Sequence, residues 1–198
     1  MKKPILLSLV FLSSLLHAEN IIFPDDAGVV NVKTAYGAKG DGVTDDTAAL
    51  RKLFDEQRGS MNTLYFPNGT YLISDSVGVF GGKPHSRDRF LILQGQSEKG
   101  VVIKLKDHAA GFQDPEKSKI MFSLYQGQST GDVMHSYVYN MSFDVGSGNP
   151  GAVGLRFMSN NTGGNGFSTL VAESIGGETK TLANKIPWGF MPVYRSGR

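Results

Sequence analysis

The sequence predicts a mostly β protein wound as a parallel β-helix, and three observations favour this fold. Short apolar strands alternate with corners rich in glycine and asparagine, and 25 of the 198 residues are glycine. Residues 137–145 alternate apolar and polar side chains, as a half-buried strand requires. Asn140 and Asn165 precede successive predicted strands 25 residues apart, which suits one coil of a β-helix. An antiparallel sandwich also combines short strands with glycine turns, so periodicity leaves that alternative open.

The first part of the chain predicts one helix between short strands. Residues 36–42 form a glycine-rich bend, and a helix is expected over residues 45–57. Its residues Leu50, Leu53 and Phe54 fall on one helical face, which would pack on the strands. The strands predicted around this helix cover residues 29–32, 64–66 and 70–73.

The remainder of the chain predicts strands and no further helix. A polar stretch, residues 107–119, is expected to form an excursion loop between two of these strands. Residues 176–198 lose the strand alternation and are assigned to an atypical C-terminal tail. The predicted strands cover residues 90–93, 101–106, 121–125, 137–145, 153–157 and 167–172.

The N-terminus predicts a secretory signal peptide in residues 1–18. Lys2 and Lys3 precede an apolar stretch of twelve residues, Ile5 to Leu16, and Ala18 supplies a small residue for cleavage. Such a stretch is too short to span a bilayer comfortably, so an uncleaved membrane anchor is the weaker alternative. We therefore expect a secreted bacterial protein, extracellular or periplasmic, with no membrane segment in its mature form.

Charge and cysteine content exclude several classes of function. Lys and Arg number 20 and Asp and Glu number 18, so loss of Lys2 and Lys3 with the signal peptide leaves a neutral chain. A neutral chain lacks the basic footprint of a nucleic-acid-binding protein. The sequence has no cysteine, which excludes disulfides, thiol nucleophiles and zinc–thiolate sites.

Two sequence blocks in tandem carry a resemblance to a known family. Residues 32–50, V-K-T-A-Y-G-A-K-G-D-G-V-T-D-D-T-A-A-L, resemble the opening of the pectate-lyase-like superfamily, in its rhamnogalacturonase and epimerase-like branch related to polygalacturonases. Residues 64–73, L-Y-F-P-N-G-T-Y-L-I, resemble the next hallmark of that family. The resemblance extends over residues 30–175 and implies a right-handed parallel β-helix.

The resemblance implies that the opening motif is architectural. The helix of residues 45–57 would cap the N-terminal end of the solenoid, and Asp46 or Thr44 would cap that helix. Residues 19–175 would form the N-terminal part of the β-helix domain. The alternative is that the acidic residues bind calcium or substrate. The residues given a structural role are Gly37, Gly40, Asp41, Gly42, Asp45, Asp46, Thr47, Pro67 and Gly69.

The resemblance also implies a polysaccharide partner whose glycosidic bonds are cleaved by hydrolysis or by lyase elimination. A hydrolase of this class needs one carboxyl group to protonate the leaving oxygen and another to activate water. No metal or cofactor is expected, except calcium if the protein is a lyase. The polygalacturonase motifs Gly-His-Gly and Arg-Ile-Lys are missing, as is a closely spaced pair of aspartates in the candidate coils. The catalytic half is therefore expected to be absent, and a truncated remnant, a polysaccharide-binding module and a structural surface module are alternatives.

Asp144 is the candidate catalytic residue, because the alternation in residues 137–145 turns it away from the apolar side. Asn140, Ser142 and Arg156 are the candidate substrate-binding residues, and Arg156 could meet a carboxylate bidentately. Arg156 follows Asp144 by twelve residues, about half a coil, so the two are expected on different faces. The ordinary alternative for Asp144 is a strand-end residue that stabilises the following turn.

Other polar and aromatic residues fit ordinary structural roles at least as well. Lys104 and Lys106 form an outward basic pair, which suits either an anionic polysaccharide or a solvated strand. The histidines lack the spacing of metal ligands and are expected at the surface; they are His85, His108 and His135. Several tyrosines could stack on sugars but fit packed strands better, namely Tyr65, Tyr71, Tyr125, Tyr137 and Tyr139.

Overall fold

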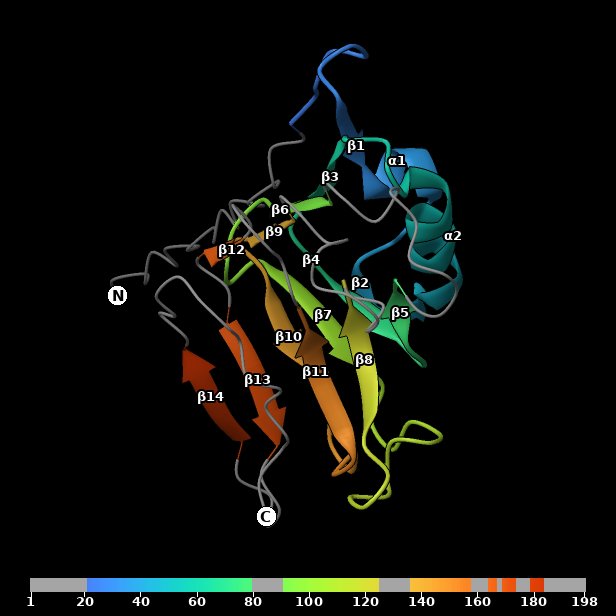
Figure 1. Ribbon diagram of the computed structural model, residues 1–198, viewed down its shortest axis with the longest axis vertical. Helices are drawn as coiled ribbons and strands as arrows, with labels where there is room; N and C mark the ends of the chain where they lie inside the picture. The colour runs from blue at the N-terminus through green and yellow to red at the C-terminus, as the bar shows by residue number, and fades with distance from the viewer. Residues whose placement is uncertain are drawn as a thin grey trace, which may run out of the picture.

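The chain folds into three sheets of stacked strands, shown in the computed structural model of Figure 1. The structure describes residues 21–79, 91–124 and 136–157, together with the backbone of three later strands. Sheet A contains β1 Val29–Asn31, β3 Thr63–Phe66, β6 Ile92–Gly95, β9 Tyr137–Tyr139 and β12 Gly164–Gly166. Sheet B contains β2 Asp41–Asp45, β4 Gly69–Ile73, β7 Val101–Leu105, β10 Ser142–Asp144, β13 Thr169–Glu173 and β14 Thr179–Ala183. Sheet C contains β5 Val77–Gly78, β8 Lys119–Ser123 and β11 Ala152–Arg156.

The chain visits the sheets in a fixed order, A then B then C. Strands β3, β4 and β5 are followed by β6, β7 and β8, and then by β9, β10 and β11. Neighbouring strands within each sheet run parallel, except that β13 and β14 are antiparallel. The predicted mostly β, parallel architecture is therefore confirmed, and the antiparallel sandwich does not describe these strands.

The spacing between coils is irregular, and the predicted period in the twenties fits only some of the coils. Thr70 pairs with Val102, Val102 with Ser142, and Ser142 with Thr169, so successive coils are separated by 32, 40 and 27 residues. Asn165 pairs with Val138, so it does not occupy the place of Asn140. The coils differ in length because the segments that join the strands differ in length.

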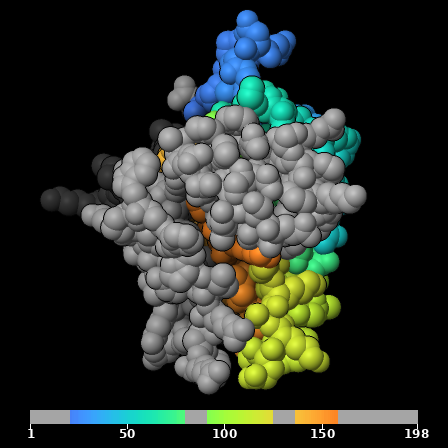
Figure 2. Space-filling model, in the orientation of Figure 1, coloured from blue at the N-terminus to red at the C-terminus, as the bar shows by residue number. Residues whose placement is uncertain are grey.

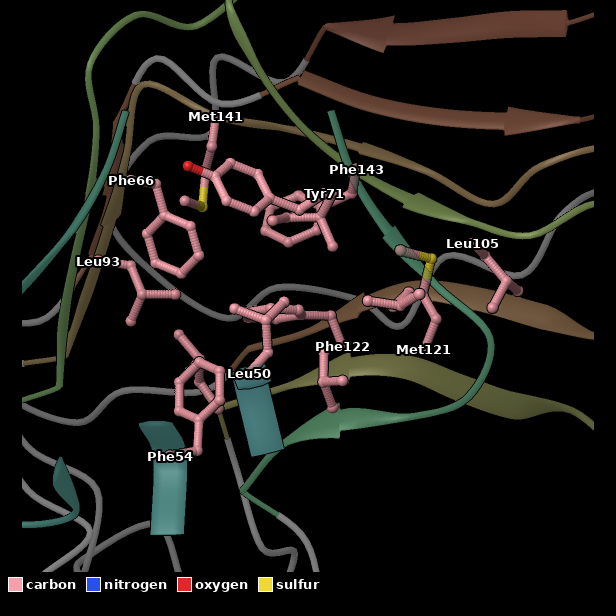
Figure 3. Packing of buried hydrophobic residues seen from close by; sticks show 14 of the residues in the cluster. Leu50, Phe54, Phe66, Tyr71, Leu93, Leu105, Met121, Phe122, Met141 and Phe143 are labelled. Carbon is pink, nitrogen blue, oxygen red and sulfur yellow. The ribbon is translucent and has the colours of Figure 1, made fainter. Parts of the chain in front are cut away.

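The space between the sheets is filled by one apolar cluster. Sheet B contributes a row across three strands, Tyr71, Ile103 and Phe143, each exposed by 1% or less. Figure 3 shows Tyr71, Phe122 and Phe143 among the side chains that fill this space. From sheet C, the ring of Phe122 lies 5.1 Å from that of Phe143, in a tilted arrangement. Aromatic side chains of this size dominate the energetics of a core, so these contacts hold the sheets together.

Two helices lie beside the first strands at one end of the stack (Figure 1). Helix α1, Val32–Tyr36, was not expected; it is a short helix just before the glycine-rich bend. Asn31 opens it, since its side chain accepts hydrogen bonds from the N–H groups of Lys33 and Thr34. Gly37 ends it in the left-handed conformation, with φ 75°, which glycine adopts without strain.

Helix α2, Thr47–Gln57, confirms the predicted helix and adds Leu50, Leu53 and Phe54 to the core. Their burial follows from the helical spacing that the sequence shows. The ring of Phe54 meets that of Phe122 edge-on at 5.5 Å. The helix therefore belongs to the same packed unit as the sheets.

The predicted cap of helix α2 by Asp46 or Thr44 is wrong. The Asp46 side chain makes no capping hydrogen bond. Its carboxylate instead accepts hydrogen bonds from the N–H groups of Lys39 and Gly40, and it is buried there. The Thr47 N–H donates to Asp45 at 2.9 Å, so Asp45 accepts from one N–H group of the first turn.

The strand predicted over residues 137–145 is two strands in two sheets. Asn140 has φ 52°, a left-handed conformation that turns the chain from β9 into β10. The turn also resets the alternation, because Val138 is buried before it and Met141 and Phe143 are buried after it. Tyr137, which was expected on the apolar side, is only half-buried.

Several elements lie where no strand was predicted. Strand β2 begins at the end of the glycine-rich bend, β5 follows β3 and β4, and β12 lies in an asparagine-glycine cluster. Strand β14 lies within the predicted tail and pairs with β13. The predicted signal peptide lies outside the described residues. In the part of the chain that the structure describes, no helix is long and apolar enough to cross a membrane.

Candidate functional site

The outer face of sheet B carries the predicted catalytic residue, and we define this face as Thr70, Leu72, Val102, Lys104, Ser142 and Asp144. Strand register places Leu72, Lys104 and Asp144 in one row across β4, β7 and β10. Successive side chains of a strand point to opposite faces, so this row faces away from the core. A long, regular face of this kind could hold an extended ligand laid across the strands.

Asp144 lies near a lysine and a turn. Its carboxylate is 4.0 Å from Lys104 Nζ, and its side chain is 30% exposed. The other oxygen, Oδ1, accepts a hydrogen bond from the Gly146 N–H at 2.9 Å. Both the catalytic prediction and the ordinary turn-stabilising alternative are therefore compatible with its placement, since one oxygen serves the turn and the other faces Lys104.

Ser142 was expected to point outward beside Asp144, but it is buried. Its side-chain hydroxyl donates to the Glu98 carbonyl oxygen at 2.9 Å. Only 8% of the residue is exposed. The segment between β6 and β7 covers this end of the face. The Ser142 hydroxyl therefore links the start of β10 to that segment.

Asn140 lies at the corner between sheets A and B, half-buried. Its carbonyl oxygen lies against Gly95. A Cβ atom added to Gly95 would be only 1.8 Å from this oxygen. The corner therefore depends on a glycine in the coil before it, which the sequence did not reveal. Asn140 lies between β9 and β10, two residues before Ser142, so it is not part of the outer face of sheet B.

Arg156 lies on β11 in sheet C, opposite Ser123 in strand register. Asp144 lies on β10 in sheet B, so the expected placement of the two residues on different faces is confirmed. The structure therefore brings Asp144 and Lys104 together and keeps Arg156 apart from them.

The structure brings a second carboxylate, Asp107, close to Asp144. Its Oδ1 accepts from the Ser147 N–H at 2.9 Å, next to the Gly146 N–H that binds Asp144. The same oxygen is 3.0 Å from the position of a Cβ on Gly146. With standard backbone dimensions, the two Oδ1 atoms are therefore at most about 8.5 Å apart. The proximity of Asp107 and Asp144 was not predicted, because the two residues are far apart in the sequence and belong to different coils.

The segment that carries Asp107 forms exposed surface beside β8, coloured yellow-green in Figure 2. His108 is exposed there and has φ 52°, in the left-handed region. Lys106 is also exposed, and Phe112 anchors the segment in the core. The predicted excursion loop over residues 107–119 is thus found, up to the start of β8 at Lys119.

Asp45 lies in the same register row as Asp144 but on β2, three strands away. At about 4.8 Å for each strand, that separation is about 14 Å, too far for a pair of catalytic carboxyls. Burial raises the pKa of Asp45, but hydrogen bonds from Ser74 and Thr47 outweigh burial and hold the pKa below its ordinary value. Asp45 therefore stays charged and serves the helix entrance.

The glycines of the opening motif make room for close packing. Gly40 has φ 59°, and a Cβ there would lie 3.0 Å from the ring of Tyr71 and from Lys33. Gly69 lies against the Gly40 carbonyl oxygen, where a Cβ would approach to 2.3 Å. Lys33 Nζ donates to the Asn68 carbonyl oxygen at 3.0 Å. These contacts match the architectural role expected for the motif.

The remaining motif residues form local hydrogen bonds. The Pro67 carbonyl oxygen accepts from the Tyr71 hydroxyl at 2.7 Å, and burial raises the pKa of Tyr71. Thr47 Oγ1 accepts from the Ser74 N–H at 2.8 Å. Gly42, with φ 76°, lies in the bulged strand β2 next to Asp41. None of these groups belongs to the outer face of sheet B, where Asp144 lies.

An ion cluster around Asp75 was not predicted. Arg51 donates to its Oδ2 at 2.7 Å, and Lys119 Nζ is 2.6 Å from its Oδ1. Burial raises the pKa of Asp75, but the hydrogen bonds from Lys119 and Arg51 outweigh it and lower the pKa to about 2. The cluster joins α2, the start of β8 and the segment before β5, which gives it a structural role.

The residues described by the structure contain no group of three or more His, Cys, Asp or Glu side chains that could hold a metal ion. His85 and His135 lie outside the described residues. Among the tyrosines, Tyr71 is in the core, whereas Tyr137 and Tyr139 stack on each other with ring centroids 5.5 Å apart. Tyr125 lies outside the described residues.

A family model described as rhamnogalacturonase A/epimerase, pectate lyase-like matches residues 29–175 of the chain. The non-secreted LysM effector LysM19 of Penicillium expansum is 35% identical over 96 residues, which is 48% of this chain and 7% of that protein. The preneck appendage protein of Bacillus phage PZA is 38% identical over 78 residues, which is 39% of this chain and 8% of that protein. The chain thus spans less than a tenth of the length of these two relatives.

Two solved structures resemble the fold with modest overlap. Geobacillus virus E2 ORF18 superposes with a TM-score of 0.47 at 25% identity, covering 64% of this chain and 22% of that one. The A-module of Azotobacter vinelandii mannuronan C-5 epimerase AlgE6 superposes with a TM-score of 0.47 at 21% identity, covering 71% of this chain and 37% of that one.

Proposed function

Because the chain belongs to the rhamnogalacturonase A/epimerase, pectate lyase-like family, we propose that it is a carbohydrate-active protein acting on glycosidic bonds of an extracellular polysaccharide. The match over residues 29–175 is the observation that carries this proposal. Residues 1–18 act as a signal peptide, and the mature protein is extracellular or periplasmic in a bacterium. Residues 19–175 form the N-terminal part of the β-helix domain.

The proposed fold is a right-handed β-helix whose N-terminal end is capped by α2. The repeated order of sheets A, B and C supports the winding. Burial of Leu50, Leu53 and Phe54 in the shared core supports the cap, because the first coil would otherwise expose its apolar interior.

The polysaccharide lies across the outer face of sheet B in this proposal. In a hydrolase, Asp144 and Asp107 act as the two carboxyl groups, since an upper limit of about 8.5 Å between their Oδ1 atoms is compatible with the separation that such pairs need. In a lyase, Asp144 accepts the sugar proton while Lys104 offsets the charge of the uronate. Calcium takes part only in the lyase version, where it would add to this charge compensation.

Activity assays on a panel of polyuronides and glucans test this proposal. We expect new reducing ends from at least one substrate, and unsaturated products if the reaction is an elimination. Asp144→Asn should lower the rate about 100-fold or more, because it removes proton transfer and leaves shape unchanged. Asp55→Asn, an exposed change on α2, is the matched control and should retain full activity. Cleavage that persists in Asp144→Asn would exclude Asp144 as the catalytic group.

A second candidate function is a non-catalytic binding or structural module. The hydrogen bond from the Gly146 N–H to Asp144 favours it, because a turn alone explains that carboxylate. The similarity to a phage preneck appendage protein adds support. Binding of a polysaccharide without any cleavage product would favour this function over the first.

A further inference from the structure

Strand β2 is one edge of sheet B among the described strands, and its backbone is irregular. Sheet B ends with β2, which pairs with β4 alone among its described strands. Asp41 pairs with Thr70 and Asp45 with Leu72, so β2 uses two more residues than β4 between the two pairings. Extra residues of this kind form a bulge, which bends an edge strand away from regular pairing.

The Asp41 carboxylate closes this bulge. Its Oδ1 accepts hydrogen bonds from the N–H groups of Val43 at 2.9 Å and Thr44 at 2.7 Å. Its Oδ2 accepts from the Thr44 hydroxyl at 2.7 Å. One side chain therefore occupies two successive backbone donors of the edge strand.

The edge would otherwise be suited to pairing with another chain. Residues Asp41, Val43 and Thr44 are exposed, and the Val43 side chain, 82% exposed, is an apolar group without cover. A free edge strand with unpaired N–H groups and an apolar side chain is a template for strand addition. The partner that such an edge fits is the same edge of a second copy of this chain.

We propose that Asp41 guards the β2 edge against strand pairing with a second copy of the chain by occupying the Val43 and Thr44 N–H groups. Hydrogen bonds from Thr44 and Val43 lower the pKa of Asp41 to about 2, so the carboxylate accepts these bonds throughout the neutral and mildly acidic range. The protection is present above the ordinary aspartate pKa and is lost only as the pH falls through about 2. This role does not depend on any catalytic activity.

Sedimentation velocity and amide hydrogen exchange of the purified protein test the proposal. We expect Asp41→Ala to shift the mass distribution toward dimers and larger species and to speed exchange of the Val43 and Thr44 amides at least ten-fold. Asp55→Ala removes the same charge from an exposed position on α2 and should leave both measurements unchanged. Asp41→Asn keeps a side-chain oxygen acceptor and should stay close to the wild type.

A second substitution identifies the edge as the route of association. Asp41→Ala combined with Val43→Lys should restore the wild-type mass, because an exposed lysine on an edge strand opposes pairing. The proposal is overturned if Asp41→Ala keeps the wild-type mass, or if Val43→Lys fails to reverse its association. If Asp41→Ala does not fold, the wild type decides: Val43 and Thr44 amides that exchange at the rate of an unfolded chain overturn the proposal.

Discussion

Gly95 and Asn140 show how single residues shape the corner between sheets A and B. The carbonyl oxygen of Asn140 occupies the space in which any side chain on Gly95 would lie. Asn140 itself adopts a left-handed conformation, which asparagine tolerates better than most residues. The two residues lie in successive coils, so each coil constrains the residue type of its neighbour.

Gly95→Ala is expected to destabilise the protein by about 1–3 kcal/mol, because the obstructing atom belongs to the backbone and cannot move aside cheaply. Gly37→Ala is the comparison, since a Cβ at Gly37 would meet no other atom. The only expected cost is that of holding alanine at a φ of 75°. That cost is about 1 kcal/mol. Urea unfolding followed by circular dichroism measures both. Equal stability of Gly95→Ala and the wild type would contradict this packing.

Asn149 and Asp46 perform structural work that residue type alone did not predict. Asn149 is 1% exposed, and its side chain binds the backbone of Lys106, Val145 and Ala109. Asp46 is 2% exposed and binds two backbone N–H groups in the preceding bend. Asp46 was predicted to cap a helix and Asn149 was given no role, because the partners of both residues come from loops that local sequence patterns do not place.

At the scale of elements, α2 joins the core through one face of the helix. Phe54 is 1% exposed and packs against Phe122 of sheet C. We expect Phe54→Ala to lower the free energy of unfolding by about 3–5 kcal/mol, because it leaves a cavity in the shared core. Lys52→Ala, exposed on the same helix, should change it by less than about 0.5 kcal/mol. Thermal or urea unfolding measures both variants.

A small effect of Phe54→Ala, close to that of Lys52→Ala, would mean that α2 is separable from the sheets. It would also remove the support for its proposed capping role.

Elements with a strong local pattern could be predicted, and elements made by long-range pairing could not. Strand β7 was predicted because Val101, Ile103 and Leu105 fall on one side of an alternating segment, and all three are buried. Strand β2 has no such pattern, since it is exposed and takes its pairing from β4. The prediction of a single strand over residues 137–145 was wrong. The apolar and polar residues alternate through the whole segment in the sequence, but the backbone turns at Asn140.

The candidate site was predictable in part for the same reason. The local alternation of residues correctly placed Asp144 on an outer face. The distance of about half a coil from Asp144 correctly placed Arg156 on a different face. The approach of Asp107 to Asp144 needs the register of β7 and β10, which are 40 residues apart along the chain. No local pattern reports such a contact, and none reports the burial of Ser142 by the segment before β7.

For the whole molecule, the three sheets present different outer surfaces. The middle of sheet C is buried on both faces, because consecutive residues of β8, Met121 to Ser123, are fully buried. Sheet A presents an uncharged surface that includes the stacked pair Tyr137 and Tyr139. Sheet B presents Lys104 and Asp144 side by side. Charged groups that can move protons lie on sheet B, so this is the surface on which we place polysaccharide chemistry.

Mapping a bound oligosaccharide by NMR amide shifts tests this placement most directly. The labelled protein would be titrated with oligosaccharides of a polyuronide and, separately, of a glucan. The account predicts that one of them shifts the amides of β7 and β10, including Lys104 and Asp144, and leaves those of β3 and β6 in sheet A unchanged. Shifts confined to sheet A, or no shifts with either sugar at millimolar concentration, would contradict it.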